Sequence, residues 1–306
     1  MLRRFLVMRD RRSQPRQKIA IILSLEVAKT RCKKVLAGAA LVLLLLVGLG
    51  LILYPLLSNY FASGEQSAVQ AQYIDEVSAM GNTEIEAELK AARLYNEALL
   101  SVQGTDEVKL RAYDELLNFA GNGVMATLEI PAIDAELPIY HGVGEDVLQK
   151  GAGHMPGTSL PVGGESTHAV ISAHSGLPAA RLFTDLDKLE AGDLFYIHVL
   201  GETLCYEVDQ IVVTIPSDTD AVQIVEGKDY VTLLTCTPYG VNTHRLLVRG
   251  RRTEAPEMPP TVADEPEQPE RASTWTEKYL QGIAFGMAGA ALLIGSLVLA
   301  WKIKKN

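Results

Sequence analysis

The chain has 306 residues, of which 48% are hydrophobic and 21% are charged, and its formal net charge at pH 7 is −9. This composition excludes a disordered chain, and the acidic balance argues against general nucleic-acid binding, which requires a basic face. Three cysteines are too few for a disulfide scaffold. A mean hydropathy of +0.12 is high for a soluble domain, so we expect part of the apolar content to lie in membrane segments.

The chain begins with a basic stretch that is followed by an uncharged apolar run. Residues 1–34 carry eleven Lys or Arg against Asp10 and Glu26, and residues 35–57 carry no charge. About 20 apolar residues span a bilayer, and cationic flanks stay in the cytoplasm. The run is too long for a signal-peptide core, and no Ala-x-Ala-like site follows it. We therefore expect a cytoplasmic N-terminus over 1–34 and an uncleaved transmembrane helix over 35–57.

A helical segment is expected next, over residues 58–122. Apolar residues recur at helical spacing at Ile85, Leu89, Ala92, Tyr95 and Leu99. Thr83 and Glu86 have the spacing of a capping box at the start of this helix. A second amphipathic stretch contains Leu110, Tyr113 and Leu117. The simplest interpretation is a structural lead-in to the next domain.

From residue 123 to residue 253 the pattern changes to short apolar runs. These runs are rich in Val, Ile, Thr and Tyr and are separated by Gly, Pro and Asp, which is typical of a sandwich or closed barrel of short strands. The expected strands lie in residues 126–133, 136–142, 168–174, 193–200, 203–215, 229–236 and 243–252. The stretch is long enough for its own core.

The C-terminal part of the chain carries a second apolar run. Residues 254–270 are rich in Pro and Glu and cannot bury a core, so we expect an extended linker over 254–279. Residues 280–301 are uncharged and long enough to cross a bilayer as a second transmembrane helix. The basic tail over 302–306 places this end in the cytoplasm as well. Residues 58–279 then lie outside the cell.

The candidate catalytic group is a cysteine. Cys32 lies among basic residues before the first apolar run, and Cys205 lies within a predicted strand, where a small buried residue is expected. Cys236 ends a predicted strand and opens the turn TPYGVN. A thiol at a strand end can meet a substrate while the strand holds it rigidly.

Two further residues complete the candidate site. The predicted hairpin around TPYGVN places Arg245 close to Cys236, where a guanidinium can support an oxyanion. A base must come from elsewhere in the fold, and His174 is the best candidate, because it follows a strand and precedes a turn. His244 is expected on the opposite face, because side chains alternate along a strand. No His pair has zinc-ligand spacing with a Cys, and no calcium loop motif occurs, so we expect no metal and no cofactor.

These motifs resemble those of the sortases. Thr232–Cys236 reads TLLTC, which matches the family's TLxTC motif, and a His and an Arg stand at the expected positions. The longer match resembles the class C sortases, which polymerise pilins, and the two apolar runs also fit that class. The matching segments are residues 128–142, 151–164, 173–197 and 230–252.

The resemblance implies a mainly β fold, a closed sortase-type barrel of about eight strands with short helices, preceded by a helical segment and flanked by two transmembrane helices. It implies that Cys236 is the nucleophile, which cleaves an LPxTG-like sorting signal between Thr and Gly and forms a thioacyl-enzyme. It implies that His174 acts as acid and base, and that Arg245 stabilises the oxyanion. The implied acceptor is a Lys amine of a pilin subunit. The implied location is the cell membrane of a Gram-positive bacterium, crossed twice, with the catalytic domain outside.

The sequence departs from the class C pattern in two places. The residues around the histidine read AHSGLP over 173–178, where class C members usually read GHRGLP. The inhibitory lid of the family usually carries an Asp-Pro-aromatic motif, whereas Gly104–Val108 here reads GTDEV. We therefore expect no conventional lid over Cys236.

Three other functions remain open. A sortase could attach proteins to amines of cell-wall peptides instead of polymerising pilins. An L,D-transpeptidase is disfavoured, because Thr235–Cys236 lacks the Ser-x-Gly-Cys segment of that family. A catalytically silent, membrane-anchored β-domain that binds a partner would not need Cys236 as a nucleophile.

Overall fold

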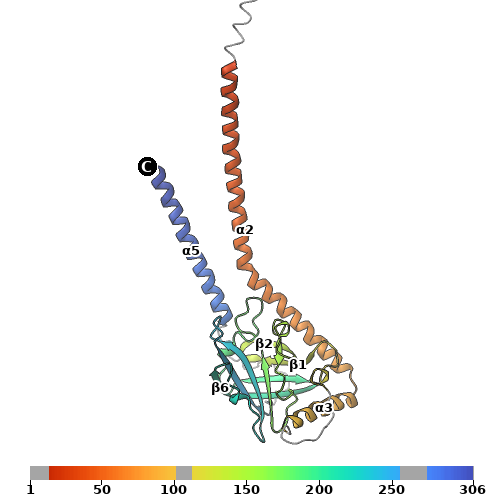
Figure 1. The fold of residues 1–306 in the computed structure, drawn as a ribbon. Coiled ribbons are helices and arrows are strands. Elements are labelled where there is room, and N and C mark those ends of the chain that lie inside the picture. Colours follow the sequence, from red (N-terminus) through yellow and green to blue (C-terminus); the bar gives the residue numbers. More distant parts are fainter. Residues whose placement is uncertain (1–13, 101–111, 256–273, 306) are drawn as a thin grey trace, which may run out of the picture. The chain divides into compact units, whose positions relative to one another are not determined.

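The computed structural model describes residues 14–100, 112–255 and 274–305, which include two long helices and a β-barrel (Figure 1). The chain divides into two compact units, Met1–Tyr54 and Pro55–Asn306. The predicted linker over 254–279 and the lid stretch Gly104–Val108 lie wholly or largely outside the described residues.

The first helix is much longer than the predicted membrane span. Helix α2 runs from Gln14 to Ala79 without interruption, with Pro55 inside it. Its apolar side chains between Val35 and Leu57 are largely exposed, and among the described residues Arg31–Ala79 is the one stretch long and apolar enough to cross a membrane. Residues 58–79, predicted as part of a separate lead-in, therefore continue this helix.

The second predicted helix is present, but its start differs from the prediction. Helix α3 covers Asn82–Leu100, so Thr83 lies inside the helix and the capping box of Thr83 and Glu86 is wrong. Gly81 precedes the first turn instead, and its N–H donates to Glu84 Oε2 at 3.1 Å. Glu84 thus has the role of the capping-box Glu, because it stands three residues after Gly81 and accepts a bond from its N–H.

The third predicted helical stretch is only a short turn in the described residues. Tyr113–Glu115 forms the 3-10 helix η1, and Leu110 lies outside the described residues. Leu116 and Leu117 are fully buried in the core. Burial of these two side chains against the barrel sets the path of the chain here more strongly than helical periodicity does.

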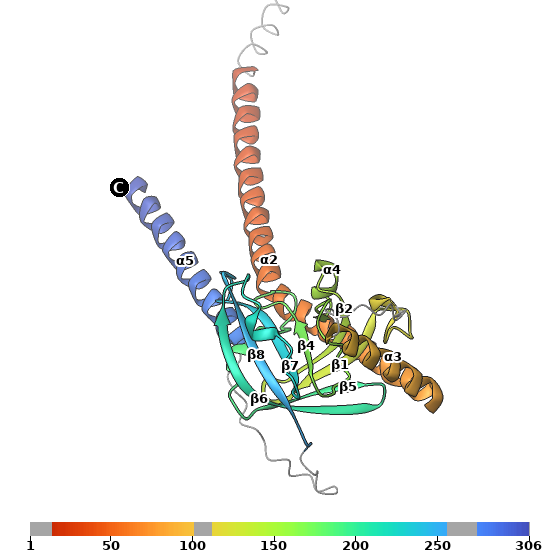
Figure 2. The same ribbon diagram turned by 60° about the horizontal axis from the view of Figure 1, so that its bottom comes forward.

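The β-domain is a closed barrel of eight strands, as the resemblance implied (Figure 2). The strands are β1 (Val124–Ile130), β2 (Ala135–His141), β3 (Ala152–His154), β4 (Thr167–Ser172), β5 (Leu194–Val199), β6 (Glu202–Thr214), β7 (Asp229–Thr237) and β8 (His244–Thr253). Their order around the barrel is β1-β2-β3-β4-β7-β8-β6-β5. The pairs β2/β3 and β4/β7 are parallel, and the other neighbours are antiparallel.

Short helices connect the strands. They are η2 (Pro131–Ile133), α4 (Glu145–Leu148), η3 (Leu186–Lys188) and η4 (Asp220–Val222). The first of them shortens a predicted strand, because β1 ends at Ile130 and Pro131 opens η2. Proline lacks the N–H that a strand ladder needs. Helix α5 covers Thr274–Lys305 and includes the predicted apolar run over 280–301.

The core of the barrel also contains side chains of the helices that precede it. Tyr73 and Val77 of α2 and Leu89 and Ala92 of α3 are buried in the same cluster as the strands. The Tyr73 hydroxyl donates to the Met125 carbonyl at 3.2 Å. This packing fixes the end of α2 from Pro55 onward, together with α3, to the barrel.

Candidate active site

The structure brings Cys236 and Arg245 together across a hairpin. The two residues are direct partners in the antiparallel pair of β7 and β8. In such a pair the Cβ atoms of facing residues lie roughly 4.5–5.5 Å apart on the same face of the sheet. This pairing agrees with the hairpin predicted around TPYGVN. Cys236 is half-buried and forms no disulfide.

His174 reaches the same end of the barrel from the other side of β7. Strand β4 runs parallel to β7, with Ser172 opposite Leu234. His174 and Cys236 each follow these partners by two residues, so both lie at the C-terminal end of their strands. The Ala173 N–H continues the ladder by donating to the Leu234 carbonyl at 3.1 Å. Cys236 is therefore flanked by the His174 segment on one side and by Arg245 on the other.

A buried threonine fixes the backbone next to His174. The Thr235 hydroxyl donates to the carbonyl of Ala173 at 2.7 Å, and Thr235 is only 3% exposed. Thr235 precedes Cys236, and Ala173 precedes His174. One hydrogen bond thus ties together the two chain segments that carry the candidate nucleophile and the candidate base.

The loop after His174 is held by further contacts. The Phe183 N–H donates to the His174 carbonyl at 3.0 Å, and the Gly176 N–H donates to Thr184 Oγ1 at 3.1 Å. Gly176 has φ of +77°, and a side chain there would meet the ring of Tyr239 at 3.4 Å. The loop after Cys236 therefore packs against the loop after His174, and a glycine suits both the backbone and the contact.

The guanidinium of Arg245 is oriented by its own hairpin loop. Its Nη1 donates to the carbonyls of Asn242 at 3.3 Å and His244 at 3.1 Å. Asn242 adopts φ of +63°, a left-handed conformation that asparagine tolerates better than most residues. These two bonds hold the cationic group near the mouth of the hairpin that Cys236 opens.

Glu145 is a residue of the site that the sequence did not reveal. Its Oε2 lies 3.3 Å from His174 Nε2, which is an ion-pair distance without hydrogen-bond geometry. The His174 side chain is 26% exposed and that of Glu145 is 68% exposed. Gln149 Nε2 donates to the other carboxylate oxygen at 3.0 Å. Because the Glu145 carboxylate is largely exposed, water weakens its attraction for the His174 ring.

Two other histidines lie outside this group of residues. His244 pairs with Thr237, one position from the Cys236–Arg245 pair, and its Nδ1 contacts Thr243. His154 is fully buried, with Nε2 bonded to the Ser159 carbonyl at 2.8 Å, and burial lowers its pKa to about 4. Throughout the part of the chain that the structure describes, no group of three or more His, Cys, Asp or Glu could hold a metal ion.

Cys205 lies in β6 as predicted. It is 1% exposed, and burial raises the pKa of its thiol. A buried thiol with a raised pKa forms little thiolate, which is the reactive species. Cys236 is therefore the cysteine of the barrel that is placed for chemistry.

This geometry supports acyl transfer through a thioester. A thiol, an imidazole and a guanidinium lie on three neighbouring segments at one end of a rigid barrel. Such a set supplies a nucleophile, a proton carrier and a cation for a developing oxyanion.

Comparisons with known proteins agree with this chemistry. Residues 128–253 match the sortase domain. Sortase D of Bacillus subtilis is 30% identical over 178 residues, which cover 56% of this chain and 85% of that protein. The crystal structure of Streptococcus pneumoniae sortase C is 48% identical and covers 61% of this chain and 97% of the solved one, with a TM-score of 0.56.

A third similar protein of known structure is also a sortase C. The Clostridium perfringens sortase C structure, which contains the C-terminal cell wall sorting motif, is 47% identical. It covers 62% of this chain and all of the solved one, with a TM-score of 0.56. The identity and the coverage place this chain in the sortase family, as a sortase-type cysteine transpeptidase whose structural neighbours are sortases C.

Proposed function

We propose that this enzyme polymerises pilins, by cleaving an LPxTG-like sorting signal between Thr and Gly and joining the acyl group to a Lys amine of another pilin subunit. The observation that carries this proposal is the placement of Cys236 between Arg245 and the His174 segment at one end of the barrel. Acyl transfer needs these three groups within reach of one carbonyl.

In the first half-reaction the Cys236 thiolate attacks the Thr carbonyl carbon of the sorting signal. The carbonyl oxygen gains negative charge, which the Arg245 guanidinium stabilises. The C–N bond to Gly then breaks, and protonated His174 gives its proton to the leaving amine. The products are a Cys236 thioester and a free peptide that begins with Gly.

In the second half-reaction a Lys amine attacks the thioester carbonyl. Neutral His174 accepts a proton from this amine, and the C–S bond breaks to restore the Cys236 thiolate. The product is an isopeptide bond between two subunits. Water competes for the same thioester, so hydrolysis is the expected slow side reaction when no amine is present.

The preference for pilins is supported by the structural neighbours. The Streptococcus pneumoniae sortase C structure is described in terms of pilin substrate specificity, and the Clostridium perfringens enzyme was solved with a sorting motif. Both are more than 45% identical to this chain. This likeness supports a substrate with an LPxTG-like tail and an acceptor Lys.

The proposed location is the cell membrane of a Gram-positive bacterium, crossed twice. Helix α2 provides the first span, within Arg31–Ala79. The second span is proposed from the sequence alone, which is uncharged and apolar over residues 280–301 of helix α5. Basic residues flank both helices at the ends that we place in the cytoplasm. This leaves the barrel outside the cell, where pilins are assembled.

The second candidate function is attachment of proteins to cell-wall peptide amines, which uses the same thioester. To separate the two, the purified full chain is incubated with a peptide carrying the sorting signal and with either a pilin containing an acceptor Lys or a peptidoglycan-like amine. We expect an isopeptide product with the pilin and none with Cys236→Ala. Faster transfer to the wall amine would favour the anchoring function. Pilus polymerisation that persists in cells carrying Cys236→Ala would favour a silent binding domain.

A further inference from the structure

A buried histidine lies on the face of the barrel that leads to Cys236, outside the residues used in the chemistry. On β7, alternation places Thr232, Leu234 and Cys236 on one face. The partners of Thr232 and Leu234 on β4 are Val170 and Ser172, so this face continues onto β4. His168 lies two residues before Val170 and therefore on the same face. It is 1% exposed.

Both ring nitrogens of His168 are bonded, each to a different segment. Nδ1 lies 2.8 Å from the Gln223 carbonyl oxygen, and Nε2 lies 2.7 Å from Thr232 Oγ1. A carbonyl oxygen only accepts, so Nδ1–H is the donor. Burial lowers the pKa of His168, so the ring is neutral near pH 7, and Nε2 accepts from the Thr232 hydroxyl. The ring thus bridges β7 and the chain at Gln223.

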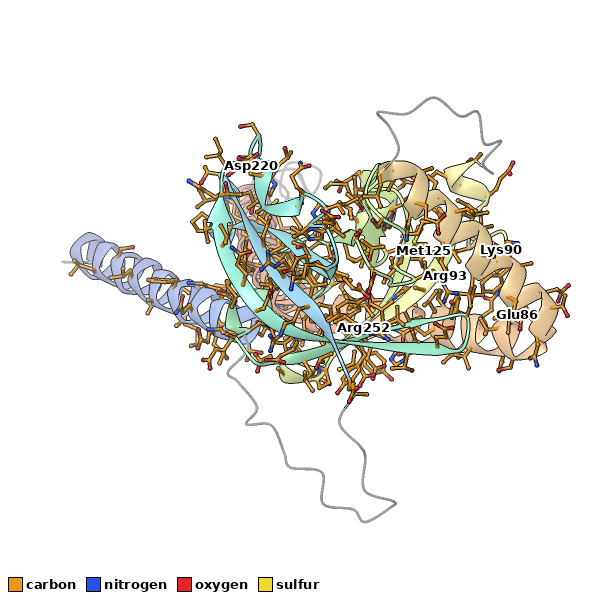
Figure 3. The ribbon with its side chains drawn as sticks, turned by 90° about the horizontal axis from the view of Figure 1, so that it is seen from below. Glu86, Lys90, Arg93, Met125, Asp220 and Arg252 are labelled. Carbon is orange, nitrogen blue, oxygen red and sulfur yellow. The ribbon has the colours of Figure 1, made fainter. Side chains whose placement is uncertain are left out.

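Gln223 belongs to residues 215–228, which connect β6 to β7 and are called here the β6–β7 connection. It begins directly after Thr214, the register partner of Arg245, which is itself the partner of Cys236. Figure 3 shows Asp220 of this connection and Arg252 of β8 at opposite ends of the β6–β8 pair. The connection therefore starts beside the reacting residues and is tied down at Gln223.

The charged groups around His168 support a neutral ring. Arg249 lies over the Tyr230 ring at 4.2 Å and is bonded by both carboxylate oxygens of Asp209. The Tyr230 ring lies 5.6 Å from that of His168. The Arg249 cation disfavours a second proton on His168, and Asp209 opposes that effect.

From these contacts we propose that His168 is a positioning residue for substrate binding, which anchors the β6–β7 connection at Gln223 so that it borders the strand face leading to Cys236. The inference rests on the proposed function, because the substrate that crosses this face is the sorting-signal peptide. His168 contacts neither Cys236 nor the reacting atoms. Its loss should weaken peptide binding and leave the chemical step intact.

Variants that remove one or both of these bonds test this role in the full chain. His168→Leu removes both bonds, and Thr232→Val removes the donor to Nε2 while keeping the side-chain shape. His168→Gln keeps one donor and one acceptor and is the conservative variant. His198→Leu is the matched control, because His198 lies on β5 and contacts Glu129 and Thr203 instead.

The first readout is steady-state cleavage of an LPxTG-type peptide. We expect His168→Leu to raise KM about three- to tenfold with kcat changed less than about twofold, as for the loss of one or two hydrogen bonds. Thr232→Val should raise KM less, and His168→Gln and His198→Leu should resemble the wild type. An unchanged KM in folded His168→Leu would overturn the proposal. If His168→Leu does not fold, an unchanged KM in Thr232→Val would overturn the proposal instead.

The second readout is hydrogen exchange, which needs no substrate. Amides of residues 215–228 should exchange faster in His168→Leu, while those of β7 and β8 keep their protection. Unchanged exchange there would overturn the tether whatever the kinetics show. If the wild type does not cleave the peptide at all, the proposed function fails, and the exchange result still decides whether His168 holds the connection.

Discussion

Replacing Thr235 by valine removes one hydroxyl and leaves the shape of the side chain unchanged. In the structure this hydroxyl donates to the Ala173 carbonyl at 2.7 Å, and both residues are 3% exposed. A buried carbonyl that loses its donor costs about 1–3 kcal/mol. At about 2–4 °C per kcal/mol for a domain of this size, we expect the melting temperature to fall by roughly 2–12 °C.

The same substitution should reduce activity, because Ala173 directly precedes His174. Freed from Thr235, the Ala173 carbonyl must move toward another donor, and the imidazole moves with the backbone. A displacement of about 1 Å can cost up to about 100-fold in rate, and we expect a loss in kcat of about tenfold for a smaller movement.

The assay is peptide cleavage together with thermal unfolding of the full chain. Thr235→Ser keeps the hydroxyl and should retain most of the activity. Thr203→Val removes an exposed hydroxyl that contacts His198 on another strand and should change stability by less than about 0.5 kcal/mol. The reasoning is refuted if Thr235→Val matches the wild type in both measurements, or if Thr235→Ser is as damaging as Thr235→Val.

Three further predictions follow from the titratable and reactive groups. Burial lowers the pKa of His154 from 6.5 to about 4. As the pH falls, this histidine is therefore protonated in the unfolded chain before it is protonated in the folded one. Its neutral form contributes fully to the free energy of unfolding above pH 6.5, and this contribution is lost as the pH drops toward 4. The loss amounts to about 3 kcal/mol. Measured by urea unfolding between pH 7 and pH 4.5, the free energy of unfolding should fall less steeply with decreasing pH in His154→Gln than in the wild type. An equal slope would contradict this assignment. Glu145→Gln should lower kcat/KM by less than about fivefold, because the Glu145 side chain that faces His174 is largely exposed, and 1 M salt should abolish the difference. A loss of more than about 50-fold would mean that Glu145 does more than stabilise a charge. Iodoacetamide should modify Cys236 in the native protein and Cys205 only after denaturation, and mass spectrometry that finds native modification of Cys205 at a similar rate would show that β6 is less well packed than described.

Strands and the hairpin could be predicted from the sequence because their determinants are local. Alternating β-branched residues over β6, β7 and β8 mark strands, and the turn between Cys236 and His244 sets their register. Once that register is fixed, the pairing of Cys236 with Arg245 follows. The choice of His174 depended on its position between a strand and a turn.

Other features depend on contacts between distant segments and could not be predicted in this way. Strand β3 has only the residues Ala152–His154 and no strand-forming side chain, and it exists because β2 and β4 pair with it. A side chain at Gly153 would collide with the Gly142 carbonyl, so the glycine reflects close approach and not flexibility. Glu145 reaches His174 only once the barrel has closed.

The central claim is that Cys236 forms a thioester with the N-terminal part of the sorting signal. It is tested most directly by mixing the wild-type enzyme with an LPxTG-type peptide, quenching in acid before an amine is added, and measuring the mass of the protein and of its fragments. The account predicts a gain equal to the peptide through its Thr less one water, located on Cys236 and lost on addition of a Lys amine. Cleavage of the peptide without this adduct, or an adduct on another residue, would contradict it.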